Sequence, residues 1–151
     1  MSLHAKLTRP MALVAAAGIG LTGAPIVAHA ADAAGTPVKS IQEAAQQGAQ
    51  IFAHESFGGS GACEMCHSNG GRSDGKLPDG RTIPSLIGAA AEFPHFSTRS
   101  QSVITLSQQI GRCIIGALHG TPPTPGAPQL INLETYVTSL SKGTVMGKQF
   151  D

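Results

Sequence analysis

Apolar residues recur at helical spacing in three segments of the chain. The first segment follows Ser40, a residue type that caps helices, and its apolar stripe consists of Ile41, Ala44, Ala45, Gly48, Ile51 and Phe52. This pattern predicts a helix that ends just before a cysteine motif at residues 63–67. From Asn69 to Gly80, glycine, serine, aspartate and lysine dominate, which favours a loop.

The second segment extends from about Gln101 to Leu118. Its apolar face consists of Leu106, Ile110, Cys113, Ile114 and Ala117. Gly120 favours an end to this helix, and the proline-rich connector over 120–128 disfavours helix. The third segment closes near Gly143, with an apolar face of Leu130, Leu133, Tyr136, Val137 and Leu140. No segment alternates clearly as a strand would, so we expect an all-α fold.

The first thirty residues have the pattern of a secretory signal. Lys6 and Arg9 precede a run of small apolar residues, and "AHA" at 28–30 offers a cleavage site after Ala30. Alanine and glycine dominate this run, where a membrane anchor would favour leucine. We therefore expect a signal peptide over 1–30, a polar lead-in over 31–39, a domain over 40–151, and attachment to a membrane only if the signal stays uncleaved.

Composition narrows the classes of partner. Removing Lys6 and Arg9 leaves 10 − 2 = 8 basic residues against 9 acidic ones, a formal charge of −1, so no basic patch for nucleic acid is present. The chain has five phenylalanines, one tyrosine and no tryptophan, which limits the core that it can build from its own side chains. A large apolar cofactor would complete such a core.

The motif "CEMCH" at 63–67 supplies a candidate cofactor. Cys-x-x-Cys-His is the attachment sequence for c-type haem: the thiols of Cys63 and Cys66 form thioethers with the vinyl groups, and His67 becomes an axial iron ligand. A zinc half-site would need two more ligands in a matching pair, and a redox dithiol of the thioredoxin kind would need strands. The motif therefore predicts one covalent haem c.

The order of the parts fits a class I cytochrome c, with three main helices and long loops around the haem. "GAQIF", "CEMCH" and "LETYVTSL" resemble the three landmarks of that fold. The resemblance implies that Gly48 and Phe52 cross Tyr136. The carbonyl of Pro84 is a candidate acceptor for the far ring nitrogen of His67.

The second axial ligand is less evident, because no methionine lies between Met65 and Met146. Cys113 is the preferred candidate, since it lies on the apolar face of the second predicted helix and coordination would protect an unpaired thiol after export. Its alternative role is that of a small buried apolar residue. His119 and Met146 are the next candidates for this ligand, ahead of His95 and His54.

A longer pattern narrows the family. "FPHFSTRSQSVITLSQQIGRCIIGALHG" at 93–120, followed by "LETYVTSLSKG", resembles the haem domains of thiosulfate dehydrogenases of the TsdA type and of the SoxA subunit of SoxAX. The resemblance covers about residues 40–147 and implies that Cys113 is the distal iron ligand. Arg99 keeps a position that these families associate with the anionic substrate. Gln109 and Ala117, however, replace an arginine and a serine.

These features predict a periplasmic monohaem cytochrome that carries electrons, as a partner or subunit in the oxidation of reduced sulfur compounds. Its partner would be a redox protein, such as another cytochrome subunit. One alternative is a thiosulfate dehydrogenase-like enzyme that uses Cys113 and Arg99. Another is a haem sensor with a labile distal ligand. We favour the carrier, because lost anion contacts are worth about 1.5–3 kcal/mol each.

Overall fold

The computed structural model describes residues 38–143 of the chain. The helices are α1 (Ile41–His54), η1 (Cys63–Met65), η2 (Ala89–Glu92), α2 (Leu106–Gly116) and α3 (Pro128–Ser139), and the strands are β1 (Gly75–Lys76), β2 (Thr82–Ile83), β3 (His95–Ser97) and β4 (Ser102–Ile104). The predicted signal peptide, most of the lead-in and Met146 lie outside the described residues. Along 38–143, none of the helices has the length and hydrophobicity needed to cross a bilayer.

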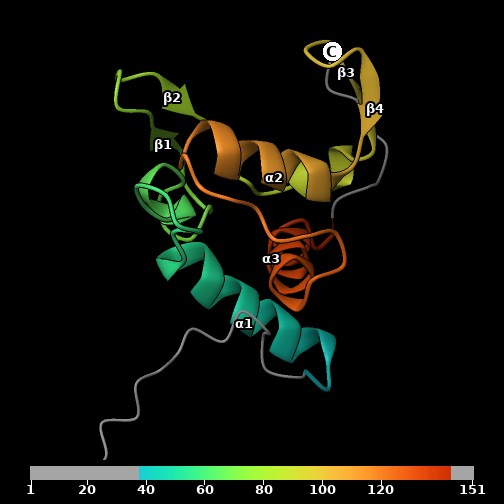
Figure 1. Ribbon diagram of the computed structural model, residues 1–151. Coiled ribbons are helices and arrows are strands. Elements are labelled where there is room, and N and C mark those ends of the chain that lie inside the picture. The colour runs from blue at the N-terminus through green and yellow to red at the C-terminus, as the bar shows by residue number, and fades with distance from the viewer. Residues whose placement is uncertain (1–37, 144–151) are drawn as a thin grey trace, which may run out of the picture. The chain divides into compact units, whose positions relative to one another are not determined.

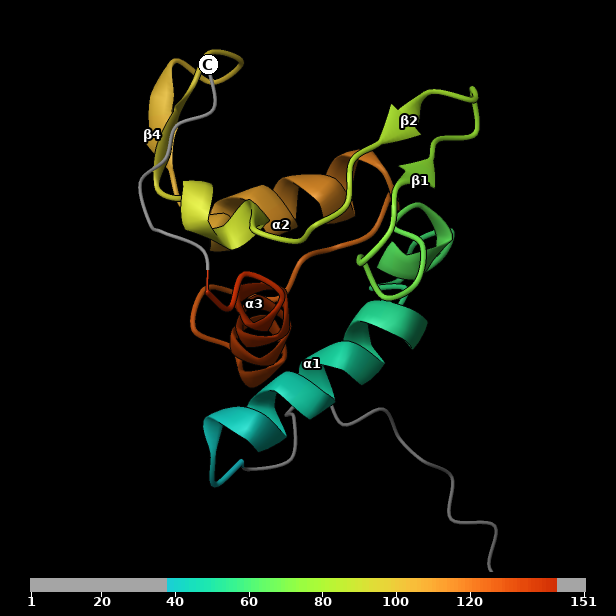
Figure 2. The same cartoon turned by 180° about the vertical axis from the view of Figure 1, so that it is seen from behind.

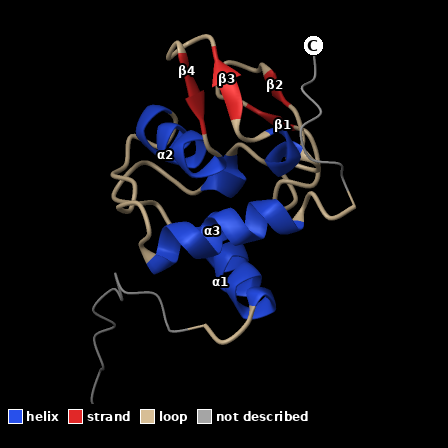
Figure 3. Cartoon of the chain, turned by 90° about the vertical axis from the view of Figure 1, so that its right-hand side faces the viewer, coloured by secondary structure: helices blue, strands red, loops and turns tan. Residues whose placement is uncertain are grey.

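The three predicted helices form the body of the domain. Figures 1 and 2 show α3 between α1 and α2, and Figure 3 shows α3 crossing α1. The expectation of a purely α-helical fold is wrong in one respect, because two antiparallel hairpins, β1–β2 and β3–β4, lie near opposite ends of α2 (Figure 1). Their strands are only two or three residues long, too short for an alternating pattern to be recognised in the sequence.

Helix α1 begins and packs as its sequence predicts, with one exception. The Ser40 hydroxyl accepts a hydrogen bond from the Glu43 backbone N–H at 3.1 Å, which caps the helix. Of the predicted stripe, Ala44, Gly48 and Phe52 are buried. Ile41, at the first helical position, is 81% exposed and departs from the predicted buried stripe.

Gly48 allows α1 and α3 to cross closely, as predicted. A Cβ atom at this position would overlap the backbone carbonyl of Asn132 and lie 2.7 Å from the Tyr136 Cβ. One turn later, the rings of Phe52 and Tyr136 lie 5.4 Å apart, tilted by 59°. This edge-on contact is a favoured aromatic geometry, so the crossing point fixes the two helices in register.

Helix α2 starts later than its periodicity predicts. Residues 102–104 form β4, and the helix begins after Thr105, whose hydroxyl accepts from the Gln108 N–H while the Gln108 side chain accepts from the Thr105 N–H. The capping box therefore determines where the helix begins, and the apolar spacing before Thr105 does not. The last helical residue is Gly116, and the Gly120 N–H donates to the Ile114 carbonyl at 3.0 Å.

Tyr136 on α3 fastens the loop that follows the cysteine motif. Its hydroxyl donates to the Gly70 carbonyl at 2.7 Å and accepts from the Arg72 guanidinium at 3.0 Å. Nearby on the same helix, the buried Asn132 amide donates to Gln47 on α1 at 2.8 Å. These bonds satisfy buried polar groups and hold the motif against the crossing of α1 and α3.

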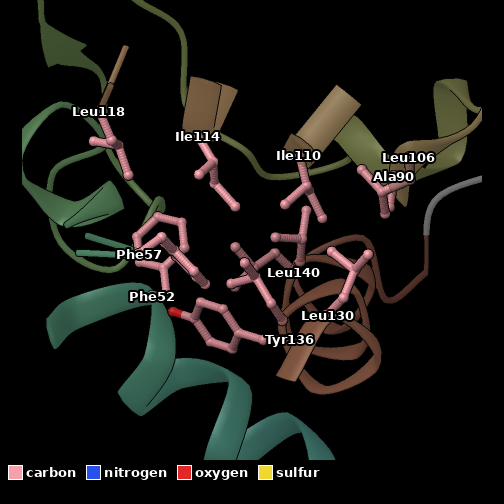
Figure 4. Packing of buried hydrophobic residues seen from close by; sticks show 12 residues of the cluster. Phe52, Phe57, Ala90, Leu106, Ile110, Ile114, Leu118, Leu130, Tyr136 and Leu140 are labelled. Atoms are coloured by element: carbon pink, nitrogen blue, oxygen red, sulfur yellow. The ribbon is translucent and has the colours of Figure 1, made fainter. Parts of the chain in front are cut away.

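The core lies between the helices. In Figure 4, Ile110 and Ile114 point from α2 toward the side chains of α1 and α3, including Phe52, Tyr136 and Leu140. Predominantly aliphatic residues fill it, as the low aromatic content predicts. Several of these side chains also face a large cavity beside the core.

Candidate functional site

A cavity of about 600 Å³ lies against the core, and all three long helices contribute to its wall. Its size is within the roughly 300–1,000 Å³ of sites for small molecules and cofactors. Most of the wall is apolar: Phe52, Leu77, Ile83, Pro84, Leu86, Ala89, Phe93, Leu106, Ile110, Ala117, Leu118, Leu133 and Val137. The remaining described side chains on it are Cys63, Cys66, His67, Glu92, His95, Gln109 and Cys113.

The cysteine motif reaches the wall through the tight turn of η1. The backbone N–H groups of Cys66 and His67 both donate to the Cys63 carbonyl, at 3.2 and 3.0 Å. Gly75 packs so closely behind the motif that a Cβ there would overlap the Cys66 carbonyl. The turn and this backing loop bring both thiols and the imidazole to one cavity, as the motif predicts.

His67 has the protonation state and surroundings of a metal ligand. Burial lowers the pKa of its imidazole, which favours the neutral ring that coordinates metals. Its Nδ1 is buried and has no hydrogen-bond partner among the described residues. The predicted bond to the Pro84 carbonyl is therefore absent from this structure, although Pro84 does line the cavity. The burial and neutral charge of the ring, rather than the unpartnered Nδ1, fit a metal ligand.

Cys113 faces the same cavity from α2. It is an exposed residue, not the small buried one of the alternative reading, because its thiol opens onto the cavity. Burial, and after it the charge of Cys113, raise the pKa of the Cys63 thiol to about 11. The pKa of the Cys113 thiol is also raised, mainly by desolvation. The Cys113 sulfur is thus close enough to the sulfurs of Cys63 and Cys66 for the charge of one thiol to affect the pKa of another.

These residues fit a haem better than the other two candidates. Within residues 38–143, no group of three or more His, Cys, Asp or Glu side chains could hold a metal ion alone, so the zinc reading lacks its ligands. The short hairpins do not provide the strands of a thioredoxin-like site. An apolar cavity with two thiols, a neutral imidazole and a third thiol matches a covalently attached porphyrin.

The structure separates the other candidate ligands. His119 follows α2, is exposed, and has a left-handed backbone conformation. It is not one of the described residues that line the cavity. His95, ranked behind it from the sequence, does line the cavity and stacks on Phe93 at 4.5 Å. His54 ends α1 and is not on the wall.

Arg72, Arg81, Arg99 and Arg112 all lie off the described wall of the cavity. Arg72 donates to Tyr136, Arg81 pairs with Asp79 at 2.7 Å on the surface, and Arg112 donates to Ser97 at 3.2 Å. Arg99 is exposed in the turn between β3 and β4. The role toward an anionic substrate that the resemblance implies for Arg99 stays a prediction.

Gln109 is a site residue that the apolar pattern did not reveal. It lies one helical turn before Cys113, lines the cavity, and donates from its side-chain amide to the Cys113 sulfur at 3.6 Å. Sulfur is larger than oxygen, so this separation is ordinary for such a bond. The four-residue spacing was the available signal, because residues four apart on a helix are neighbours.

Comparison with known proteins gives related sequences and a related fold. The chain is 36% identical over 92 residues to a thiosulfate dehydrogenase of Allochromatium vinosum, which covers 60% of this chain and 33% of the relative. It is 28% identical over 92 residues to a thiosulfate dehydrogenase of Thiomonas intermedia, covering 61% and 27%. The chain thus spans a third or less of the length of these relatives.

A solved structure and a family model agree with these relatives. The thiosulfate dehydrogenase (TsdBA) of Marichromatium purpuratum has the same fold, with a TM-score of 0.62 and 22% identity, over 76% of this chain and 26% of that one. The model described as SoxA/TsdA, cytochrome c domain, matches residues 47–146. Because this match covers more than half of the chain, the protein belongs to the SoxA/TsdA cytochrome c domain family, whose cofactor is covalently bound haem c.

Proposed function

We propose that this chain is a periplasmic monohaem cytochrome that carries electrons in the oxidation of reduced sulfur compounds such as thiosulfate. Two relatives are named thiosulfate dehydrogenases, which supports sulfur oxidation as the context. The match covers a third or less of their length, so their whole activity does not transfer to this chain. Export by the signal over 1–30 would deliver the cytochrome domain over 40–151 to the periplasm.

In this proposal four side chains would hold the haem. Cys63 and Cys66 would attach it through thioethers, and His67 and Cys113 would bind its iron. The cavity that these residues share and the neutral state of His67 support the assignment. The bound haem supplies one-electron transfer between ferric and ferrous iron. With the haem bound, the apolar wall would limit the access of water to the metal, and the thiolate of Cys113 would stabilise the ferric state.

The charge of the cavity is the observation that favours a carrier over an enzyme. No lysine or arginine is among the described side chains of its wall, while Glu92 is one of them. Thiosulfate is a dianion, and a site for it needs cationic or hydrogen-bonding groups. Gln109 and Ala117 line the wall at the positions where the resemblance implies arginine and serine.

The number of electrons released by thiosulfate oxidation also favours a redox partner protein. Joining two thiosulfate ions into tetrathionate releases two electrons, whereas one haem accepts one. A second redox protein, such as another cytochrome subunit, would be needed to complete this reaction. The exposure of Cys113 to the cavity favours the enzyme as the second candidate, since an accessible thiol could bond to substrate sulfur.

An assay of the purified holoprotein distinguishes the carrier from the enzyme. We expect no sustained formation of tetrathionate from thiosulfate with an external electron acceptor, although the ferric protein should still accept electrons from a reductant. Steady turnover by the unmodified protein would contradict the carrier.

Restoring the two missing polar groups should create an anion site. We expect the double variant Gln109→Arg, Ala117→Ser to bind thiosulfate at least about tenfold more tightly, because each charge-assisted bond is worth about 1.5–3 kcal/mol. Titration of the haem absorbance with thiosulfate measures this. Sulfate, a dianion without a reactive sulfur, is the control ligand. Equal affinities of the variant and the original protein would show that charge at this wall does not govern anion binding.

A further inference from the structure

We propose that Gln109 is a positioning residue for Cys113, and that its hydrogen bond to the Cys113 sulfur sets the reduction potential of the haem. This inference rests on the proposed role of Cys113 as an iron ligand. It goes beyond that role, because it assigns the control of the metal–sulfur bond to a second residue of α2.

The geometry is local and well defined. Gln109 and Cys113 are one helical turn apart on α2, both line the cavity, and the amide nitrogen of Gln109 lies 3.6 Å from the Cys113 sulfur. This is the only side-chain hydrogen bond to Cys113 within residues 38–143. The helix holds both Cα atoms rigidly, so the bond orients the thiol along the wall.

The bond acts on electron donation from the sulfur. An N–H group that donates to a thiolate withdraws electron density from it, and the bond is stronger when the acceptor is charged. A thiolate with less density gives less to ferric iron, which raises the potential; hydrogen bonds to ligand sulfur are a known control of potential in iron sites.

Glutamine suits this role because its amide is neutral. An arginine at this position would also donate to the sulfur, but it would bring a positive charge that attracts anions into the cavity. Gln109 keeps a hydrogen-bond donor and removes the charge. The replacement therefore fits a protein that tunes electron transfer rather than one that binds an anionic substrate.

Replacing Gln109 by leucine should lower the reduction potential. Leucine has nearly the same size and cannot donate, so we expect the Gln109→Leu holoprotein to shift about tenfold toward the ferric state, equal to about 59 mV for one electron. Potentiometric titration of the haem absorbance measures the shift, and electron paramagnetic resonance records the accompanying change in the ferric signal. Gln46→Leu on the exposed side of α1 is the matched control and should shift neither.

A second variant and a ligand control make the test decisive. Gln109→Glu keeps the length of the side chain and, when ionised, places an acceptor beside the sulfur, so its potential should fall further. Unchanged potentials in both variants, with a ferric signal that Cys113→Ala does alter, would overturn the role of Gln109 alone. An unchanged signal in Cys113→Ala would overturn Cys113 as the ligand and this inference with it.

Discussion

Replacing Gly48 by alanine should destabilise the folded holoprotein by at least about 3 kcal/mol, at the upper end of overpacking effects. The added Cβ would overlap the Asn132 carbonyl and lie 2.7 Å from the Tyr136 Cβ, and neither backbone can move without separating α1 from α3. Alanine normally favours a helix over glycine by about 1 kcal/mol, so the sign of the effect is itself diagnostic. Denaturant unfolding followed by circular dichroism measures the free energy of unfolding.

Gly111 offers a matched control for Gly48. It is also inside a helix, but a Cβ there would meet only the Pro122 Cβ, at an ordinary 3.8 Å. Gly111→Ala should therefore leave the free energy of unfolding unchanged or raise it by up to about 1 kcal/mol. Equal effects of the two substitutions would show that the crossing of α1 and α3 is not as close as the structure has it.

The double variant Cys63→Ser, Cys66→Ser should lose the covalent haem entirely. Serine forms no thioether, so the exported variant should have the mass of its amino acids alone and no haem absorbance after denaturation. Without the group that fills the cavity of about 600 Å³, the chain lacks a complete core. We expect its thermal transition to become broad or to disappear.

Cys113→Ser is the control for loss of attachment. It removes the third thiol of the cavity but leaves both proposed attachment points, so it should keep the mass of one haem. Intact mass spectrometry of the two variants and the original protein separates attachment from ligation. Retention of haem mass in the double variant would contradict attachment at Cys63 and Cys66.

Much of the helical framework could be predicted from apolar spacing. The stripe containing Gly48 and Phe52 does face α3, and Ile110 and Ile114 on α2 do face the core. Residues three or four positions apart share one face of a helix, so apolar spacing along the chain indicates which face is buried. Cys63, Cys66 and His67 lie within five consecutive residues, so the motif alone predicted their common location.

The short hairpins and the late start of α2 were not predicted. The β3–β4 hairpin depends on the pairing of Phe96 with Val103, and both side chains are at least half exposed, so burial gave no signal for the strands. The start of α2 depends on the capping box of Thr105 and Gln108, which apolar spacing does not record.

Electron paramagnetic resonance of the ferric holoprotein beside its Cys113→Ala variant tests the central claim most directly. If His67 and Cys113 hold the iron of a covalent haem between them, the original protein gives a low-spin signal typical of thiolate ligation. The variant, which still carries haem mass, should replace that signal with a different one. An identical low-spin signal in both proteins would contradict the account and place another residue at the iron.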